Sequence, residues 1–185
     1  MKAKVIGITG QTGAGKDALC EQLKKINKKA IFLRFSTPLT EALNIFTNEI
    51  KKEDQQWLGR VLRERFGEDV LARAIERKIK SLKGGLIILN GIRYESERQL
   101  LKKLGGKLVY IKADAKTRWQ RVRGRKEKKD DNSSFEKFLE MDSASTERSI
   151  LEIGQKADFI IDNNGSFAEL KDQLKSAMKC FKVKC

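Results

Sequence analysis

Histidine is absent from the 185 residues of the chain, and its absence removes much of ordinary enzyme chemistry. Histidine is the usual base of nucleophilic triads, the commonest metal ligand and the proton relay that works near neutral pH. Any chemistry must therefore use Asp, Glu, Lys, Arg and the backbone. Phosphoryl transfer suits that inventory, because it depends on alignment and charge neutralisation more than on a covalent nucleophile.

Cysteine is also scarce. Cys20, Cys180 and Cys185 are an odd, scattered set, which fits neither a disulfide framework nor a metal cluster. No apolar stretch approaches the roughly 20 residues that a membrane-spanning helix needs. The N-terminal apolar run has only the length of a strand, so no signal peptide is recognised. We therefore expect a cytoplasmic protein that does not engage a membrane.

Acidic residues are outnumbered, since 25 Asp and Glu stand against 40 Lys and Arg, for a net charge of +15. Such a balance favours anionic partners and speeds their encounter. Nucleic acid is one such partner, but no basic segment is interleaved with aromatic residues, as single-strand binding would need. Because the lysines are spread along the whole chain, we expect most to lie on solvated helix faces. Nucleic-acid binding is possible but not favoured.

The most informative segment is residues 4–17, KVIGITGQTGAGKD. A short apolar strand leads into Gly10, Gly13 and Gly15, and Lys16 then completes the phosphate-binding loop pattern G-x-x-x-x-G-K. Glycines let phosphate oxygens approach the main-chain N–H groups, and the following helix adds the positive end of its dipole. The predicted ATP-binding set is Gly10, Gln11, Thr12, Gly13, Ala14, Gly15, Lys16, Asp17 and Ala18.

Asp17 departs from that pattern, which usually has Ser or Thr after the lysine. The usual hydroxyl ligates Mg²⁺, and a carboxylate is also a hard oxygen ligand. Asp17 is therefore a candidate metal ligand. The alternative is that Asp17 only caps the helix N-terminus, where acidic side chains are favoured.

Apolar runs and apolar spacing predict strands and helices that alternate along the chain. The strands are expected at 4–9, 30–35, 86–90, 107–112 and 158–162. The alternation predicts a single α/β domain over residues 1–185 with a mainly parallel sheet. Helices are expected at 16–28, 38–82, 94–104 and from Asp114 to about 123, and the second of these has breaks near 51–54 and at Gly67. Two further helices are expected to begin at capping boxes, one from Ser133 and Glu136 to about 154 and one from Ser166 and Glu169 to about 179. A charged loop is expected at 124–133.

Four segments resemble the P-loop nucleoside monophosphate kinases, and most closely the deoxynucleoside monophosphate kinase group. The segments are FSTPLTEAL at 35–43, LRERFGEDVLARAI at 62–75, the strand, turn and helix at 86–111, and the closing segment at 142–170. The closing segment also resembles an archaeal dephospho-CoA-kinase-like group. The resemblance implies a P-loop fold with a five-stranded sheet in the order 2-3-1-4-5. It also implies ATP and Mg²⁺ as cofactors, with an acceptor-binding insert at 38–82 and a lid at about 118–135.

The resemblance also assigns roles to side chains beyond the loop. Arg93 follows an apolar strand at the carboxyl end, where ligands of α/β folds bind, and its planar fork matches phosphate oxygens. By this resemblance, Arg93 binds the phosphate of the acceptor, and the acceptor site also includes Arg34, Ser36, Arg63 and Arg65. In the lid, Arg121 and Arg125 contact the transferred phosphoryl group. The adenine is bordered by Asn163, Asn164 and Gly165.

A second departure is Asn90, which stands where the family usually has an acidic residue that orients the metal. Asp17 would compensate by moving the carboxylate into the phosphate loop. The expected reaction is phosphoryl transfer from ATP to a nucleoside or deoxynucleoside monophosphate. The alternatives are phosphorylation of a hydroxyl, as in dephospho-CoA kinase or a polynucleotide kinase, and a nucleotide-binding protein with a regulatory or RNA-linked role. The sequence does not indicate the oligomeric state.

Overall fold

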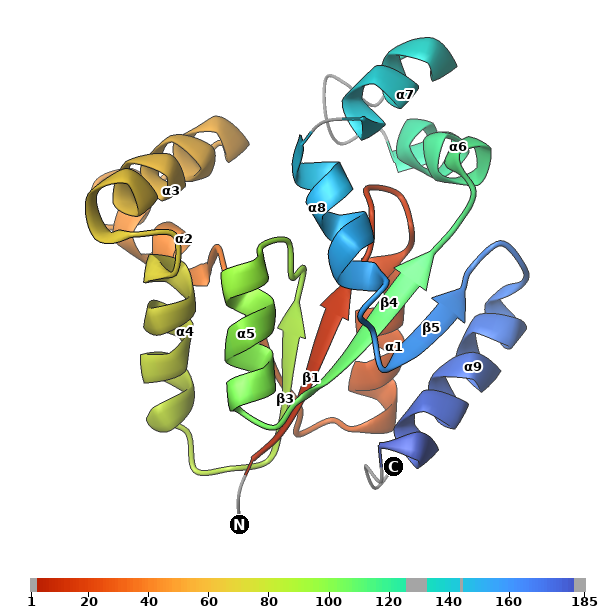
Figure 1. Cartoon of the computed structure of the whole chain (residues 1–185), viewed down its shortest axis with the longest axis horizontal. Coiled ribbons are helices and arrows are strands. Elements are labelled where there is room, and N and C mark those ends of the chain that lie inside the picture. Colours follow the sequence, from red (N-terminus) through yellow and green to blue (C-terminus); the bar gives the residue numbers. More distant parts are fainter. Residues whose placement is uncertain (1–2, 126–132, 144, 182–185) are drawn as a thin grey trace.

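A parallel sheet organises the computed structural model, which describes residues 3–125, 133–143 and 145–181 (Figure 1). Its strands are β1 (Lys4–Thr9), β2 (Ile31–Arg34), β3 (Leu86–Asn90), β4 (Lys107–Lys112) and β5 (Phe159–Asp162). They lie in the order β2-β3-β1-β4-β5, and every neighbouring pair is parallel. The expected P-loop fold and its strand order are therefore confirmed.

The helices form a layer on each face of the sheet. On one face, α1 and α9 pack over Ile6, Ile8 and Ile111. On the other face, α4, α5 and α8 pack over Val5, Leu89 and neighbouring side chains. The helices are α1 (Lys16–Ile26), α2 (Thr37–Leu43), α3 (Lys52–Phe66), α4 (Val70–Lys80), α5 (Glu95–Lys103), α6 (Ala115–Arg125), α7 (Phe135–Asp142), α8 (Ser145–Gly154) and α9 (Phe167–Cys180).

β3 shows why the sheet carries a helix layer on both faces. Its sequence LIILN is apolar without alternation, and all five residues are buried. Ile88 faces the α1 and α9 layer, whereas Ile87 and Leu89 face the α4 and α5 layer. A strand that is covered on both sides needs apolar residues at every position, as parallel sheets require.

The segment at 133–154 differs from its prediction. It forms two helices, α7 and α8, rather than one. Ser134, not Ser133, caps α7, because its hydroxyl accepts from the Lys137 amide at 3.3 Å. The hydroxyl of Ser143 donates to the carbonyl of Glu140 at 2.6 Å, which satisfies an end group of α7. Short polar side chains at the junction thus end one helix.

The elements around the phosphate loop stand at the carboxyl ends of the strands. Figure 1 shows α2 and α3 on one side of this edge and α6 and α7 on the other, with α8 between them. The turn from β1 to α1, residues 10–15, opens at the same edge. Most of the expected charged loop, residues 126–132, lies outside the described residues, and 124–125 belong to α6. Within the described ranges, no helix is long and apolar enough to cross a membrane.

Candidate active site

The phosphate loop takes its shape from two glycines in the left-handed region. Gly13 has φ 81° and Gly15 has φ 102°, which residues with a side chain rarely adopt. A Cβ at Gly13 would lie 2.6 Å from the carbonyl oxygen of Arg118. A Cβ at Gly10 would lie 2.5 Å from the carbonyl oxygen of Ile111. The loop therefore needs glycine at Gly10 and Gly13 for its own packing, and not only for the approach of a phosphate.

Lys16 points back into the loop that precedes it. Its Nζ donates to the carbonyl of Gly10 at 2.5 Å and to the carbonyl of Gln11 at 2.9 Å. Burial first, and then the positive charge of Arg93, lower the pKa of Lys16 to about 8. An anion beside Lys16 would oppose both effects. Lys16 and Arg93 thus form an electropositive centre that favours phosphate.

Two acidic side chains from the distant 142–147 segment hold the start of the loop. The Glu147 carboxylate accepts from the Thr12 amide at 3.2 Å and from the Thr12 hydroxyl at 3.0 Å. The Asp142 carboxylate accepts from the Gln11 side-chain amide at 3.2 and 3.3 Å. Sequence reasoning assigned no role to either acid, although both lie in the 142–170 segment that carried the resemblance.

Arg118 completes this contact from α6. Its guanidinium forms two bonds of 2.6 Å with Asp142 and donates to the Thr12 carbonyl at 3.2 Å. The Arg118 residue is 3% exposed, so this is a buried ion pair. Sequence analysis assigned Arg118 no role of its own. The structure makes it the link between α6, α7 and the phosphate loop.

Arg121 and Asn163 meet on the β5 side of the loop. Arg121 donates to the Asn163 carbonyl at 2.7 Å, and its other terminal nitrogen is buried, with no hydrogen-bond partner among the described residues. The Asn163 amide donates to the carbonyl of Ala14 at 2.8 Å. Asn164 accepts from the Asp114 amide at 2.8 Å. The turn predicted to border adenine therefore lies against the phosphate loop and accepts a hydrogen bond from an arginine of α6.

The remaining lid candidate, Arg125, closes α6, and its side chain lies outside the described residues. Ala18 lies within the first turn of α1 and is half-buried. Gly165 is exposed and follows Asn164 in the turn before α9.

A cavity of about 330 Å³ opens between α1, β2 and the end of β3. The resemblance predicts the acceptor on this side of α1. Asp17 and Arg34 form a 2.9 Å ion pair at the rim of the cavity, and both side chains are exposed. Asn90 also lines it, and its Oδ1 is buried with no hydrogen-bond partner in the part of the chain that the structure describes. Burial raises the pKa of the Cys20 thiol to about 12, so this thiol is a poor nucleophile. The lining residues are Asp17, Cys20, Glu21, Lys24, Phe32, Arg34, Thr37 and Asn90.

Arg93 is exposed on the turn after β3, and a buried side chain holds the backbone of this turn. The buried Glu97 carboxylate accepts from the Arg93 amide at 2.8 Å and from the Tyr94 amide at 3.3 Å. Burial raises the pKa of Glu97 to about 7. Arg63 stacks on the Tyr94 ring at 4.2 Å, and within the described ranges its buried Nε has no hydrogen-bond partner. The structure thus brings Arg63 to the Arg93 turn. The other two predicted acceptor-site residues lie elsewhere: Ser36 precedes α2 and does not line the cavity, and Arg65 is exposed on α3.

Two residues that line the cavity fit a metal in chemical terms. Asp17 and Asn90 both carry hard oxygen atoms, which Mg²⁺ prefers. Among the described residues there is no cluster of three His, Cys, Asp or Glu that would hold a metal alone. Mg²⁺ usually binds through one or two carboxylates together with substrate phosphates and water. Asp17 and Asn90 fit that mode of binding, in which the nucleotide supplies the other ligands.

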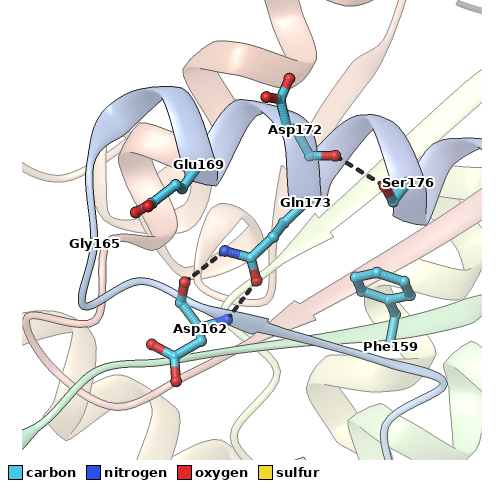
Figure 2. A pocket seen from close by; sticks show the side chains of 7 residues that line it. All are labelled: Phe159, Asp162, Gly165, Glu169, Asp172, Gln173 and Ser176. Carbon is cyan, nitrogen blue, oxygen red and sulfur yellow. Dashed lines mark hydrogen bonds between the residues drawn. The ribbon is translucent and has the colours of Figure 1, made fainter.

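A larger cavity, of about 570 Å³, lies between β5 and α9 (Figure 2). Figure 2 shows Gln173 bridging to the backbone of Asp162, where its side-chain amide bonds both the N–H and the carbonyl at 2.9 and 2.7 Å. These bonds satisfy part of the edge of the sheet. The lining includes Asp162, Glu169 and Asp172, which repel the phosphates of a nucleotide. This cavity therefore does not extend the phosphate site.

Comparison with known proteins agrees with this geometry. A family model described as an AAA domain matches residues 6–146. A UPF0200 protein of Saccharolobus islandicus strain M.16.4 is 30% identical over 172 residues, which cover 91% of this chain and 88% of that protein. The chain belongs to the AAA domain and UPF0200 families.

Solved kinase structures share the fold of this family member. A shikimate kinase from Bacteroides thetaiotaomicron aligns with a TM-score of 0.66 at 15% identity, covering 97% of this chain and 98% of that one. A dephospho-CoA kinase from Campylobacter jejuni aligns with a TM-score of 0.53 at 18% identity, covering 95% of each chain. The fold is therefore that of the P-loop kinases, and these likenesses do not identify the acceptor.

Proposed function

We propose that this UPF0200 family member is an ATP-dependent phosphotransferase that acts on a nucleoside or deoxynucleoside monophosphate. The observation that supports this proposal most strongly is that Lys16 and Arg93 lie at the same edge of the sheet: Arg93 follows Gly91 and Ile92, whose amides both donate to the carbonyl of Ile8 in β1, and its charge acts on Lys16. The phosphate loop supplies one side of this centre, and the exposed turn after β3 supplies the other. Two cations at this spot suit a γ-phosphoryl group on its way between two phosphate oxygens.

The proposed reaction assigns one task to each part of the site. Backbone amides of the loop and Lys16 hold the ATP phosphates, the Asn163 turn borders the adenine, and Arg121 beside that turn meets the transferred phosphoryl. Mg²⁺, held in part by Asp17, would neutralise charge on the phosphates. Arg93 aligns the acceptor phosphate, with Arg63 behind it on Tyr94. The acceptor oxygen is already anionic, so the chain needs only to align the reactants and stabilise the charge that develops.

A hydroxyl acceptor, as in dephospho-CoA kinase, is the second candidate. A hydroxyl must lose its proton, which requires an acidic side chain near the acceptor. Asp17 and Glu21 both line the cavity on the acceptor side. Either carboxylate would serve as that base, whereas a monophosphate acceptor would leave both without this task.

An acceptor panel tests the proposal. The eight ribo- and deoxynucleoside monophosphates and dephospho-CoA are incubated separately with ATP, Mg²⁺ and the protein, and ADP release is measured. We expect one or a few monophosphates to stimulate release. Lys16→Met and Arg93→Met should each reduce the rate by about 10²–10³-fold. Lys175→Gln, on the exposed face of α9, is the control and should not change it.

Two results would count against the proposed reaction. Stimulation by dephospho-CoA alone would favour the hydroxyl acceptor. ATP binding without stimulation by any acceptor, together with RNA binding that weakens steeply with salt, would favour the RNA-linked or regulatory alternative.

The metal role of Asp17 has its own test. Asp17→Ala should abolish Mg²⁺-dependent turnover and leave the thermal unfolding midpoint unchanged, because the Asp17–Arg34 pair is exposed and contributes little to stability. If the variant turns over at the rate of the unchanged protein at every Mg²⁺ concentration, Asp17 is only a helix-capping residue.

A further inference from the structure

The contact between Glu147 and Thr12 places a carboxylate on donors of the phosphate loop. Both carboxylate oxygens are used, one on the Thr12 amide at 3.2 Å and one on the Thr12 hydroxyl at 3.0 Å. Glu147 is only 7% exposed. A carboxylate and a phosphate present the same kind of anionic oxygen to an N–H donor. Glu147 therefore makes the contact that an oxygen of a bound phosphate would make.

The position of Lys16 shows which phosphate would compete with Glu147. In loops of this pattern, amides near the helix start hold the α- and β-phosphates, and the lysine reaches the β- and γ-phosphates. The Nζ of Lys16 lies at the carbonyls of Gly10 and Gln11, next to Thr12. The terminal phosphate is therefore expected on the Thr12 side of the loop. Glu147 also contributes to the electrostatic environment of Lys16, so its charge acts at the same place.

The helix that carries Glu147 also contacts the acceptor side. The hydroxyl of Ser149, on α8, donates to the carbonyl of Arg93 at 3.0 Å. α8 thus bridges the phosphate loop and the Arg93 turn through two side chains that lie two residues apart. Any movement that removes Glu147 from Thr12 acts on the element that also contacts Arg93.

We propose that Glu147 is a self-inhibitory latch, which occupies the γ-phosphate donors of the empty loop and is displaced by ATP but not by ADP. This inference rests on the proposed function, because it concerns the same nucleotide site. The third phosphate of ATP displaces Glu147 from Thr12. The position of α8, and of the Arg93 turn that it contacts, therefore depends on whether a triphosphate is bound. ADP, which lacks the third phosphate, leaves the latch closed.

Calorimetric titration with ATP·Mg²⁺ and with ADP·Mg²⁺, in the absence of acceptor, tests the latch. The variants are Glu147→Gln and, as a matched control, Glu152→Gln, which removes the same charge from an exposed position on α8. A competing charge-assisted hydrogen bond lowers apparent affinity by about 10- to 100-fold. We therefore expect Glu147→Gln to bind ATP about 10- to 100-fold more tightly and ADP with little change. Glu152→Gln should bind both nucleotides as the unchanged protein does.

A second variant covers the case in which Glu147→Gln does not fold, which thermal unfolding would reveal. Glu147→Asp keeps the negative charge but shortens the side chain by one methylene, which withdraws the carboxylate from the Thr12 donors and leaves the phosphate loop unaltered. It should tighten ATP binding several-fold and leave ADP binding unchanged.

Three results would overturn the latch. ATP affinity that is unchanged or weaker in Glu147→Gln would show that Glu147 does not compete. Equal tightening for ATP and ADP would show a general effect of charge. Both of these leave the proposed function standing, because nucleotide still binds. Failure of the unchanged protein and of Glu147→Gln to bind either nucleotide would overturn the proposed function and the latch together.

Discussion

The buried ion pair between Arg118 and Asp142 yields a prediction about stability whose size follows from its surroundings. The Arg118 side chain is 4% exposed, and that of Asp142 is 14% exposed. Two bonds of 2.6 Å join them, and the other hydrogen bonds of the Arg118 guanidinium within the described residues go to the backbone carbonyls of Ala113 and Thr12. Asp142→Ala therefore leaves a buried guanidinium without a counter-charge.

Removing one partner of a buried pair costs about 3–5 kcal/mol. Two unit charges about 4 Å apart attract by about 4 kcal/mol at an effective dielectric constant near 20, which agrees with that range. We therefore expect Asp142→Ala to lower the free energy of unfolding by about 3–5 kcal/mol in urea denaturation. The control is Asp172→Ala, whose partner Lys175 is 56% exposed. That change should cost no more than about 1 kcal/mol.

The double variant Arg118→Met/Asp142→Leu separates a lost charge balance from lost packing. Replacing both partners by apolar side chains leaves no isolated charge, so the double variant should be more stable than Asp142→Ala alone. If Asp142→Ala costs no more than the exposed control, the reasoning about this buried pair is wrong.

The remaining predictions concern pH. The pKa of Lys16 is about 8 without nucleotide, and phosphate charge should raise it, so ATP binding at pH 8–9 should take up protons. Calorimetry in buffers of different ionisation enthalpy measures this uptake, which Lys16→Met should abolish. Burial raises the pKa of Glu97 from 4.5 to about 7 in the folded protein. Between these two pH values the unfolded chain has lost this proton and the folded protein still holds it, so the free energy of unfolding should fall as the pH rises from about 4.5 to 7. Glu97→Gln stays neutral and should lose less stability between pH 5 and 8 than the unchanged protein, by roughly 2–3 kcal/mol in urea denaturation.

Features encoded within short stretches of the chain were predicted well. The glycines and Lys16 of the phosphate loop follow a fixed spacing, and the apolar run at 86–90 requires burial on both faces. The capping box at Ser166 and Glu169 was also correct, because both partners lie in one turn. The strand order came from the family resemblance, since local patterns do not specify which parallel strands are neighbours.

The contacts that the sequence did not predict join distant parts of the chain. Thr12 and Glu147 are 135 residues apart, and Gln11 and Asp142 are 131 apart. No local pattern pairs an acid with a glycine-rich loop at such separation. The break between α7 and α8 was missed for a different reason. The predicted single helix ran through the polar stretch 142–149, DSASTERS, where the hydroxyl of Ser143 satisfies the end of α7.

The most direct test of the account is whether the phosphate loop binds a triphosphate through Lys16. ATP·Mg²⁺ is titrated into the unchanged protein and into Lys16→Met, with thermal unfolding to verify that both are folded. The account predicts saturable binding to the unchanged protein that is lost or greatly weakened in Lys16→Met. Equal binding by the two folded proteins, or none by the unchanged protein, would contradict it.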